Sequence, residues 1–350
     1  MAASLIAFFV ALVASLVLAV PVRALALRVG MVDLPGPRKV HLQPIPLLGG
    51  LAIYGGVLLG AFSLFQGEAR AQIGGILAGA TLIAAVGILD DRGWLHHQVK
   101  LFIGMPLAAC ILLLSGIHAQ VFSVLVGGRL GEVLDAVLSV IWVVGITASF
   151  SILDHMDGLC AGIAAMASIF FVALAYLNGQ TLVSVLAAAV LGAAAGFLRW
   201  NFKPAKIFMG DGGAMFLGFL MATLGLKLRL EHANHFSSWL APVLVLGATI
   251  FDTTLVTISR SRRGLLPFAT PGKDHAAHRL ANLGLGQRGA VLAMYLVGAI
   301  SGSLAILVSY LSTKQAVLVA LFTVATVLAG VALLERAPYE RQAKKASTAA

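Results

Sequence analysis

The stretch from residue 159 to residue 198 reads LCAGIAAMASIFFVALAYLNGQTLVSVLAAAVLGAAAGFL and contains no charged side chain. Its two halves, 159–177 and 181–198, are each long enough to cross the ~30 Å hydrocarbon core of a bilayer as an α-helix. The residues between them, 178–180, form a nearly minimal turn. Because a polypeptide in lipid must satisfy its backbone groups internally, this stretch predicts two membrane-spanning helices joined by a tight connection.

Similar apolar segments recur along the whole chain. Of its 350 residues, 60% are hydrophobic and 11% are charged, which is far outside the composition of soluble domains. We therefore predict one all-α polytopic membrane domain over residues 1–350, with a tail at 335–350 and no separate soluble domain. The expected fold has eleven transmembrane helices, near residues 4–22, 46–65, 73–89, 99–117, 133–152, 159–177, 181–198, 213–228, 237–258, 289–311 and 315–334.

Lysine and arginine are distributed unevenly between alternate connections. Of the 24 such residues, 19 fall at 23–45, 90–100, 199–212, 259–288 and 335–350. Because excess positive charge stays cytoplasmic, we predict that the N-terminus is outside and the C-terminus is cytoplasmic. The net charge of +10 follows largely from this topology, and no nucleic-acid partner is needed because the basic residues form no single stripe. Cys110 and Cys160 have no motif spacing and are expected to be buried apolar side chains.

The inside connections carry dense polar clusters, and loops of this kind often form functional sites. The first cluster, at 33–50, contains several prolines and the pair Gly49-Gly50, which predict an extended path. It presents Arg38, Lys39 and His41 together, as an anionic ligand would require. An ordinary positive-inside loop is the alternative.

Carboxylates gather at the same predicted membrane boundary. Asp90 and Asp91 are adjacent, and two neighbouring carboxylates repel each other unless a cation or a shared proton relieves them. Mg²⁺ is the natural candidate, because it binds a few carboxylates together with substrate phosphates. The alternative is a capped helix end in which the pair is neutralised by Arg92 and Lys100.

Two further acidic positions follow along the chain. Asp154 and Asp157 would share one face if this segment is helical, and Gly158 would allow a break. Asp211 stands between glycines, where a turn could direct backbone N–H groups at a phosphate while the carboxylate holds a metal. A helix N-cap is a compatible alternative for Asp211.

The longest inside loop is basic and contains histidines. His275 and His278 are three residues apart, and they lack the carboxylate context of a helical zinc motif. Together with Lys273 and Arg279 they fit phosphate binding better. Asp252 is a carboxylate within a predicted span and is therefore a functional candidate, with a buried structural pairing as the alternative.

Taken in order, these clusters resemble the polyprenyl-phosphate N-acetylhexosamine-1-phosphate transferase family, over about residues 33 to 297. The similar motifs are the loop from Asp33 through Pro46 to Gly49-Gly50, Leu89-Asp90-Asp91, Leu153-Asp154-His155-Met156-Asp157-Gly158, Asn201, Pro204-Ala205, Phe208-Met209-Gly210-Asp211, Phe251-Asp252-Thr253, and the His-rich loop from His275 to Leu280. Eleven spans with an outside N-terminus resemble the branch that uses UDP-N-acetylglucosamine or a related sugar.

The resemblance implies transfer of sugar-1-phosphate from a UDP-N-acetylhexosamine to polyprenyl (undecaprenyl) phosphate, with release of UMP. It also implies a Mg²⁺ cofactor, with Mn²⁺ as an alternative, a cytoplasmic active-site cleft and a bacterial plasma membrane. The oligomeric state stays open, with a homodimer as one option. The implied metal residues are Asp211 and Asp90; the implied catalytic residues are Asp90, Asp91, Asp154, Asp157, His275 and His278; the implied substrate-binding residues are Arg38, Lys39, His41, Lys100, Ser151, Asn201, Asp252, Lys273 and Arg279.

The chain departs from the family pattern at two places. Ala148 and Ser151 stand where two asparagines are usual, and one histidine of the His-rich loop is replaced by alanine. A catalytically impaired relative that binds lipid phosphate or nucleotide is therefore one alternative function. A transporter of lipid-linked sugars is a second, and it ranks last because the outer halves of the spans are almost purely apolar.

Overall fold

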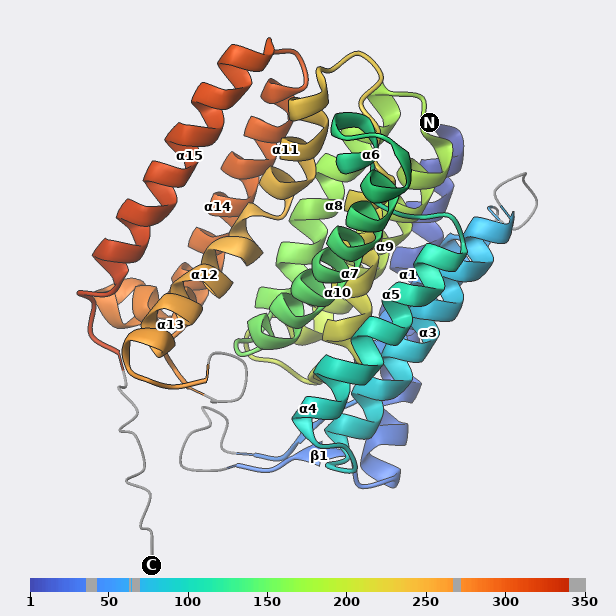
Figure 1. Cartoon of the computed structure of the whole chain (residues 1–350). Coiled ribbons are helices and arrows are strands. Elements are labelled where there is room, and N and C mark those ends of the chain that lie inside the picture. Colours follow the sequence, from blue (N-terminus) through green and yellow to red (C-terminus); the bar gives the residue numbers. More distant parts are fainter. Residues whose placement is uncertain (36–42, 63, 65–69, 267–271, 340–350) are drawn as a thin grey trace, which may run out of the picture.

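The computed structural model describes residues 1–35, 43–62, 64, 70–266 and 272–339. Within these ranges the chain is a helical bundle with one short β-hairpin-like pair, in which Val32 pairs with Pro46 (Figure 1). The elements are α1 (Ala2–Arg28), β1 (Val32–Asp33), β2 (Ile45–Pro46), α2 (Gly50–Gly60), α3 (Arg70–Asp91), α4 (His97–Val99), η2 (Lys100–Gly104), α5 (Met105–Leu114), α6 (Phe122–Leu125), α7 (Gly128–Leu153), α8 (Leu159–Leu177), α9 (Thr181–Asn201), α10 (Gly210–Lys227), α11 (His235–Val245), α12 (Gly247–Arg262), α13 (Ala276–Leu280), η3 (Ala281–Leu285), α14 (Gly286–Val308) and α15 (Thr313–Leu334).

The helices have the length and composition of a multi-pass membrane protein. Among the described residues, seven helices are long and apolar enough to cross a bilayer, or up to eight if the bent pair of α11 and α12 counts as one span. The axes of that pair differ by 72°. Every expected span contains a helix, although α2 has only 11 residues. The all-α membrane architecture is thus confirmed, whereas eleven crossings and their orientation stay predictions.

Burial increases from the edge of the bundle to its centre. Helix α10 is buried along almost its entire length and packs against α3 and α7, while α9 packs against α1 and α8. By contrast, α1 and α15 expose most of their apolar side chains, as lipid-facing helices do. Cys160 is buried as expected, but Cys110 is exposed. It lies on the opposite face of α5 from the buried Met105, Ala109 and Leu112.

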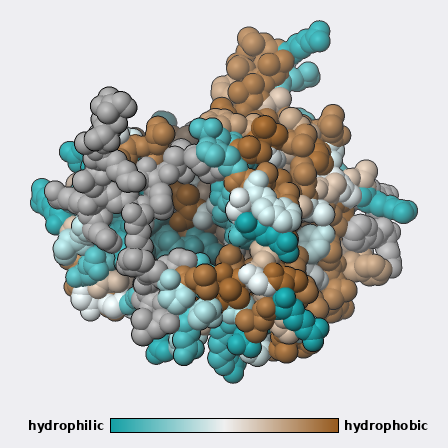
Figure 2. All heavy atoms as spheres, turned by 90° about the horizontal axis from the view of Figure 1, so that it is seen from below, coloured by the Kyte–Doolittle hydropathy of each residue, from teal (hydrophilic) through white to brown (hydrophobic). Residues whose placement is uncertain are grey.

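Polar loops gather at one end of the bundle. Helix α1 begins at the upper end in Figure 1 and α15 finishes at the lower end, where α3, α7 and α9 also end and α10 begins. Seen from below, polar side chains line part of a hollow in this face (Figure 2). The candidate site is built from the segments that meet here.

Candidate active site

Two carboxylates from different helices meet across one ammonium group. Asp90 lies in the last turn of α3, and Asp211 lies in the first turn of α10. The Nζ atom of Lys100, the first residue of η2, lies 2.6 Å from Asp90 Oδ2 and 2.6 Å from Asp211 Oδ2. We call these three residues the acidic centre. Their side chains are between 15% and 23% exposed, so a small ligand can still reach them.

A close approach of α3 and α10 brings these carboxylates together. A Cβ atom on Gly87 would lie 2.5 Å from the carbonyl oxygen of Asp211, so only glycine permits this contact. Asp91 then accepts hydrogen bonds from the amides of Asp211 and Gly212, at 2.8 Å and 3.1 Å. A carboxylate at a helix N-terminus satisfies free N–H groups and complements the helix dipole. Asp91 therefore holds the first turn of α10 against the end of α3.

Ser151, in the last turn of α7, adds a further contact to the acidic centre. Its hydroxyl donates a hydrogen bond to Asp211 Oδ1 at 2.5 Å. The other oxygen of the same carboxylate bonds Lys100. Both oxygens of Asp211 are thus oriented by side chains from two other segments.

Asp154 lies in a turn beside this centre. The sequence suggested that Asp154 and Asp157 share a helical face, but α7 ends at Leu153 and residues 154–158 are not helical. Burial raises the pKa of Asp154 to about 8, and the carboxylates of Asp211, Asp91 and Asp157 raise it in the same direction. Several carboxylates that raise one another's pKa form a site where a cation would be stabilised.

Asp157 and Asn201 attach this turn to the loop that precedes α10. Asp157 Oδ2 accepts a hydrogen bond from the amide of Ala205 at 3.1 Å. Asn201 is buried; its Oδ1 accepts from the amide of Gly158 at 3.0 Å, and its Nδ2 donates to the carbonyl of Ile207 at 3.0 Å. These contacts fix the positions of Asp154 and Asp211 relative to each other.

His275 is oriented by a buried carboxylate of α12. Its Nδ1 lies 2.8 Å from Asp252 Oδ2, and the amide of Ala276 donates to Asp252 Oδ1 at 2.7 Å. Arg260 Nη2 lies 3.4 Å from His275 Nε2. Asp252 is 1% exposed, so it positions the histidine from inside the protein.

His155 packs against the His-rich loop. Its ring centroid lies 4.0 Å from that of His275 and 4.7 Å from that of His278. Both of its ring nitrogens are buried, and neither has a hydrogen-bond partner among the described residues. Burial, and then the charges of His275 and His278, lower the pKa of His155 well below its usual value. His155 is therefore neutral at neutral pH. Because it directly follows Asp154 in the chain and packs on His275 and His278, it connects the acidic centre to the histidines.

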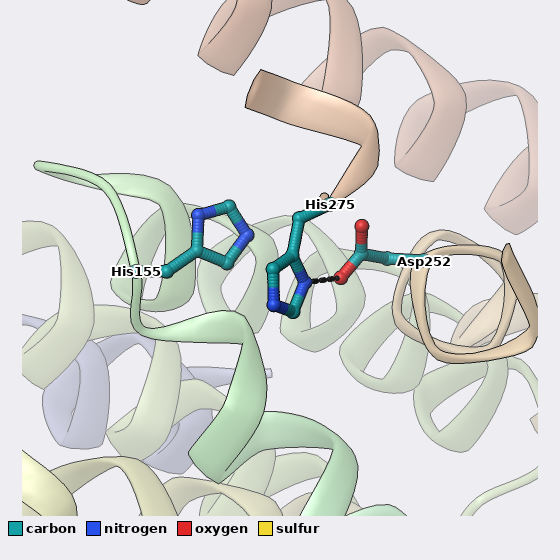
Figure 3. A group of neighbouring side chains, drawn as sticks. All are labelled: His155, Asp252 and His275. Carbon is teal, nitrogen blue, oxygen red and sulfur yellow. Dashed lines mark hydrogen bonds and ion pairs between the residues drawn. The ribbon is translucent and has the colours of Figure 1, made fainter. Parts of the chain in front are cut away.

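The ligand atoms of His155, Asp252 and His275 lie within 4.8 Å of one another, which is close enough for a metal site. Figure 3 shows, however, that the ring of His275 lies between the other two side chains and directs a nitrogen at Asp252. His275 Nδ1 and Asp252 Oδ2 are thus already hydrogen-bonded to each other and would have to separate to share an ion. The carboxylates around Lys100 are the better donor set for a hard cation.

Asp274 neutralises two arginines beside this group. Arg260 Nη2 lies 2.7 Å from Asp274 Oδ1, and Arg263 Nη2 lies 2.5 Å from Asp274 Oδ2. Burial opposes ionisation of Asp274, but the hydrogen bonds and charges of the two arginines outweigh it and lower its pKa to about 2. This ionic group forms the base of the His-rich loop.

A family model described as glycosyl transferase family 4 matches residues 73–229. A probable undecaprenyl-phosphate N-acetylglucosaminyl 1-phosphate transferase of Bacillus subtilis is 38% identical over 84% of this chain and 81% of the relative. A decaprenyl-phosphate N-acetylglucosaminephosphotransferase of Mycolicibacterium smegmatis is 32% identical over 91% of this chain and 85% of the relative. The chain belongs to glycosyl transferase family 4.

The matched region of this family 4 chain contains the whole acidic centre, whereas the His-rich loop lies outside it. The structure brings the predicted site residues together in two groups. The group around the acidic centre comprises Asp90, Asp91, Lys100, Ser151, Asp154, Asp157, Asn201 and Asp211. The group around the histidines comprises Asp252, His275 and His278. Arg38, Lys39 and His41 lie outside the described residues, and Lys273 is half-buried next to Asp274.

The structure also identifies residues that the motifs did not single out. His155 stands inside the motif from Leu153 to Gly158 but was given no role, and the only signal for Asp274 was its position next to His275. Arg279 was expected to face a diphosphate, but it is fully buried and donates to Asp274, Ser259 and Glu335. These contacts connect α13 of this family 4 protein to α12 and to the segment after α15.

Proposed function

We propose that this protein transfers N-acetylglucosamine-1-phosphate from UDP-N-acetylglucosamine to a polyprenyl phosphate and releases UMP. The acidic centre carries the proposal, because phosphoryl transfer needs positioned groups that neutralise phosphate charge. The family match contains these residues, and the relatives are named for N-acetylglucosamine phosphate transfer and for undecaprenyl or decaprenyl phosphate.

Mg²⁺ fits the acidic centre, with Mn²⁺ as an alternative. The donors are carboxylate oxygens, which hard divalent ions prefer. The pKa of Asp154 is raised first by burial and then by the neighbouring carboxylates of Asp211, Asp91 and Asp157. We assign the ion to Asp211 and Asp90, with Asp154 beside them. When bound, the ion would neutralise charge on the diphosphate of the nucleotide sugar. The hydroxyl of Ser151 orients Asp211 for this role.

The reaction exchanges one phosphorus–oxygen bond for another. An oxygen of the lipid phosphate attacks the sugar-bearing phosphorus, the bond from that phosphorus to the bridging oxygen breaks, and the electron pair leaves with UMP. Because a phosphate monoester is already ionised near neutral pH, no strong base is required. Lys100, Lys273 and His278 would bind phosphate oxygens through charge-assisted or neutral hydrogen bonds, while Asp252 holds His275 beside them.

We further propose that the site faces the cytoplasm of a bacterial plasma membrane. The support is the excess of Lys and Arg in the connections at 90–100, 199–212 and 259–288, which contribute to this end of the bundle. The lipid acceptor would then approach laterally from the bilayer.

The catalytic proposal is tested with the purified protein in detergent. Wild-type protein is incubated with a panel of UDP-sugars, polyprenyl phosphate and Mg²⁺, and UMP release and product mass are measured. UDP-N-acetylglucosamine should be turned over, and Asp211→Asn should reduce turnover by at least about 100-fold, as loss of an electrostatic partner in a phosphoryl-transfer site does. Binding of nucleotide without UMP release from any sugar would favour the impaired-relative alternative instead.

A further inference from the structure

The segment that follows α15 contacts the base of the His-rich loop. We call residues 335–339 the C-terminal clamp; it lies outside the region that the family model matches. At one end, Glu335 Oε1 accepts a hydrogen bond from Arg279 Nη1 at 2.6 Å. Nearer the other end, the carbonyl of Pro338 accepts from Asn282 Nδ2 at 3.0 Å. The clamp is thus attached both to α13 and to η3.

Tyr339 covers the guanidinium group of Arg279. The Cζ atom of Arg279 lies 3.9 Å from the centroid of the Tyr339 ring, and that of Arg263 lies 5.5 Å from it. The Tyr339 hydroxyl lies 3.3 Å from Ser259 Oγ, a longer contact. An arginine on an aromatic face gains a cation–π interaction that strengthens as the pair is desolvated. The ring therefore contributes more than its hydroxyl.

Arg279 joins the clamp to the loop that carries the histidines. It is fully buried, and its Nε donates to the carbonyl of Asp274 at 2.7 Å while its Nη2 donates to Ser259 Oγ at 2.8 Å. A buried cation is costly unless it is paired, and Glu335 is the carboxylate that Arg279 contacts. Removing the clamp would leave this charge without its partner, so the loop would have to move.

The contacts continue from Arg279 to the site. Asp274 bonds Arg279 through its carbonyl and Arg260 through its carboxylate. Arg260 in turn lies 3.4 Å from His275 Nε2. A displacement of Arg279 would therefore shift the loop that carries Lys273, His275 and His278.

We infer that the C-terminal clamp is a positioning element for the active site: Tyr339 and Glu335 hold Arg279 and thereby keep residues 273–279 in place for the diphosphate of the nucleotide sugar. This inference rests on the proposed function, which assigns that ligand to the loop. The clamp contacts Arg279 through both Glu335 and Tyr339, so its main effect on the site would pass through this arginine.

The test compares Tyr339→Ala with Tyr339→Phe, which keeps the ring over Arg279 and loses only the hydroxyl. Tyr310→Ala is the matched control, because Tyr310 is 71% exposed and lies beyond the opposite end of α14. Hydrogen–deuterium exchange of residues 274–280 is measured in each protein without any substrate. The value of kcat/KM for the nucleotide sugar is measured in parallel, together with the thermal midpoint and Mn²⁺ affinity.

Tyr339→Ala should accelerate exchange in 274–280 by about tenfold and lower kcat/KM by about tenfold, as loss of a partly buried cation–π contact would. Exchange in 154–158 and Mn²⁺ affinity should stay unchanged, and Tyr339→Phe and Tyr310→Ala should match wild type. If Tyr339→Ala does not fold, Glu335→Gln weakens the same contact more gently and should give the same pattern.

Unchanged exchange in Tyr339→Ala would overturn the inference, as would equal defects in the Ala and Phe variants. Faster exchange with wild-type kcat/KM would also overturn it, because the clamp would then hold the loop without serving the site. Failure of the proposed function is recognised separately, since wild-type protein would then release no UMP while the exchange measurement would still report on the clamp.

Discussion

Replacing Lys100 by methionine separates the two roles that its ammonium group plays. In the structure this group lies 2.6 Å from one oxygen each of Asp90 and Asp211, the carboxylates to which we assign the metal. A divalent ion bound by the same carboxylates would lie about 4 Å from Nζ, because metal–oxygen distances are about 2.1 Å. Lys100 therefore orients the carboxylates and would also repel the ion.

The size of the repulsion follows from Coulomb's law. Two unit charges about 4 Å apart interact by about 1 kcal/mol in water and by about 4 kcal/mol at an effective dielectric constant of about 20. For a divalent ion the lower bound is about 2 kcal/mol, or about 30-fold in affinity. Lys100→Met should therefore tighten Mn²⁺ binding by at least about tenfold, after some loss of carboxylate orientation. Turnover should fall by at least about 100-fold, because a phosphate-neutralising group is gone.

Mn²⁺ binding is measured by electron paramagnetic resonance titration of detergent-solubilised protein, and turnover by UMP release. Lys227→Met, at the other end of α10, is the matched control and should change neither quantity. Mn²⁺ affinity that is equal or weaker in Lys100→Met would refute the reasoning, since the lysine could then not be competing with the ion.

Two further perturbations test the scaffold of the site. Gly87→Ala would place a Cβ atom 2.5 Å from the Asp211 carbonyl oxygen and should separate α3 from α10, with loss of Mn²⁺ binding and turnover. The control is Gly74→Ala in the same helix, whose added Cβ atom meets nothing within 4 Å and which should behave as wild type. Equal behaviour of the two variants would contradict the packing argument. Asp274→Asn would remove the carboxylate that pairs with Arg260 and Arg263. It should lower the free energy of unfolding by about 3–5 kcal/mol, which is measured as a lower thermal midpoint at pH 7. The pKa of Asp274 is lowered to about 2, so the stability that its ionised form provides is present above its usual pKa near 4 and is lost as the pH falls toward 2. The difference in thermal midpoint between wild type and Asp274→Asn should therefore shrink between about pH 4 and pH 2, and should stay constant between about pH 5 and 8.

Much of the acidic centre could be anticipated from the sequence. Asp90, Asp154 and Asp211 each lie beside an apolar segment at the boundary where the sequence places its carboxylates, and the structure brings them together. The sequence could not predict that Asp90 bonds Lys100 whereas Asp91 accepts hydrogen bonds from the first amides of α10. This difference depends on which of two adjacent carboxylates reaches the amides of α10, and that is decided by the approach of Gly87 to Asp211.

The His-rich loop contains a contact that the motif does not reveal. Arg279 stands in the motif next to His278 and was expected to contact substrate, yet it is buried and holds the C-terminal clamp. No local pattern links Arg279 to Tyr339, 60 residues later in the chain. Cys110 is a similar case, because an apolar helix position faces either lipid or protein, and hydropathy is the same for both.

The sequence by itself determined the all-α membrane architecture and the side on which the ionisable residues gather. Both follow from local physics: an apolar segment of sufficient length must be helical in lipid, and charged residues are excluded from the hydrocarbon. The tertiary structure alone decided which charges are paired with one another, which carboxylates remain available to a cation, and that α11 and α12 bend by 72°. These depend on contacts between distant segments, because the energy of a buried charge is set by the groups within a few ångströms of it.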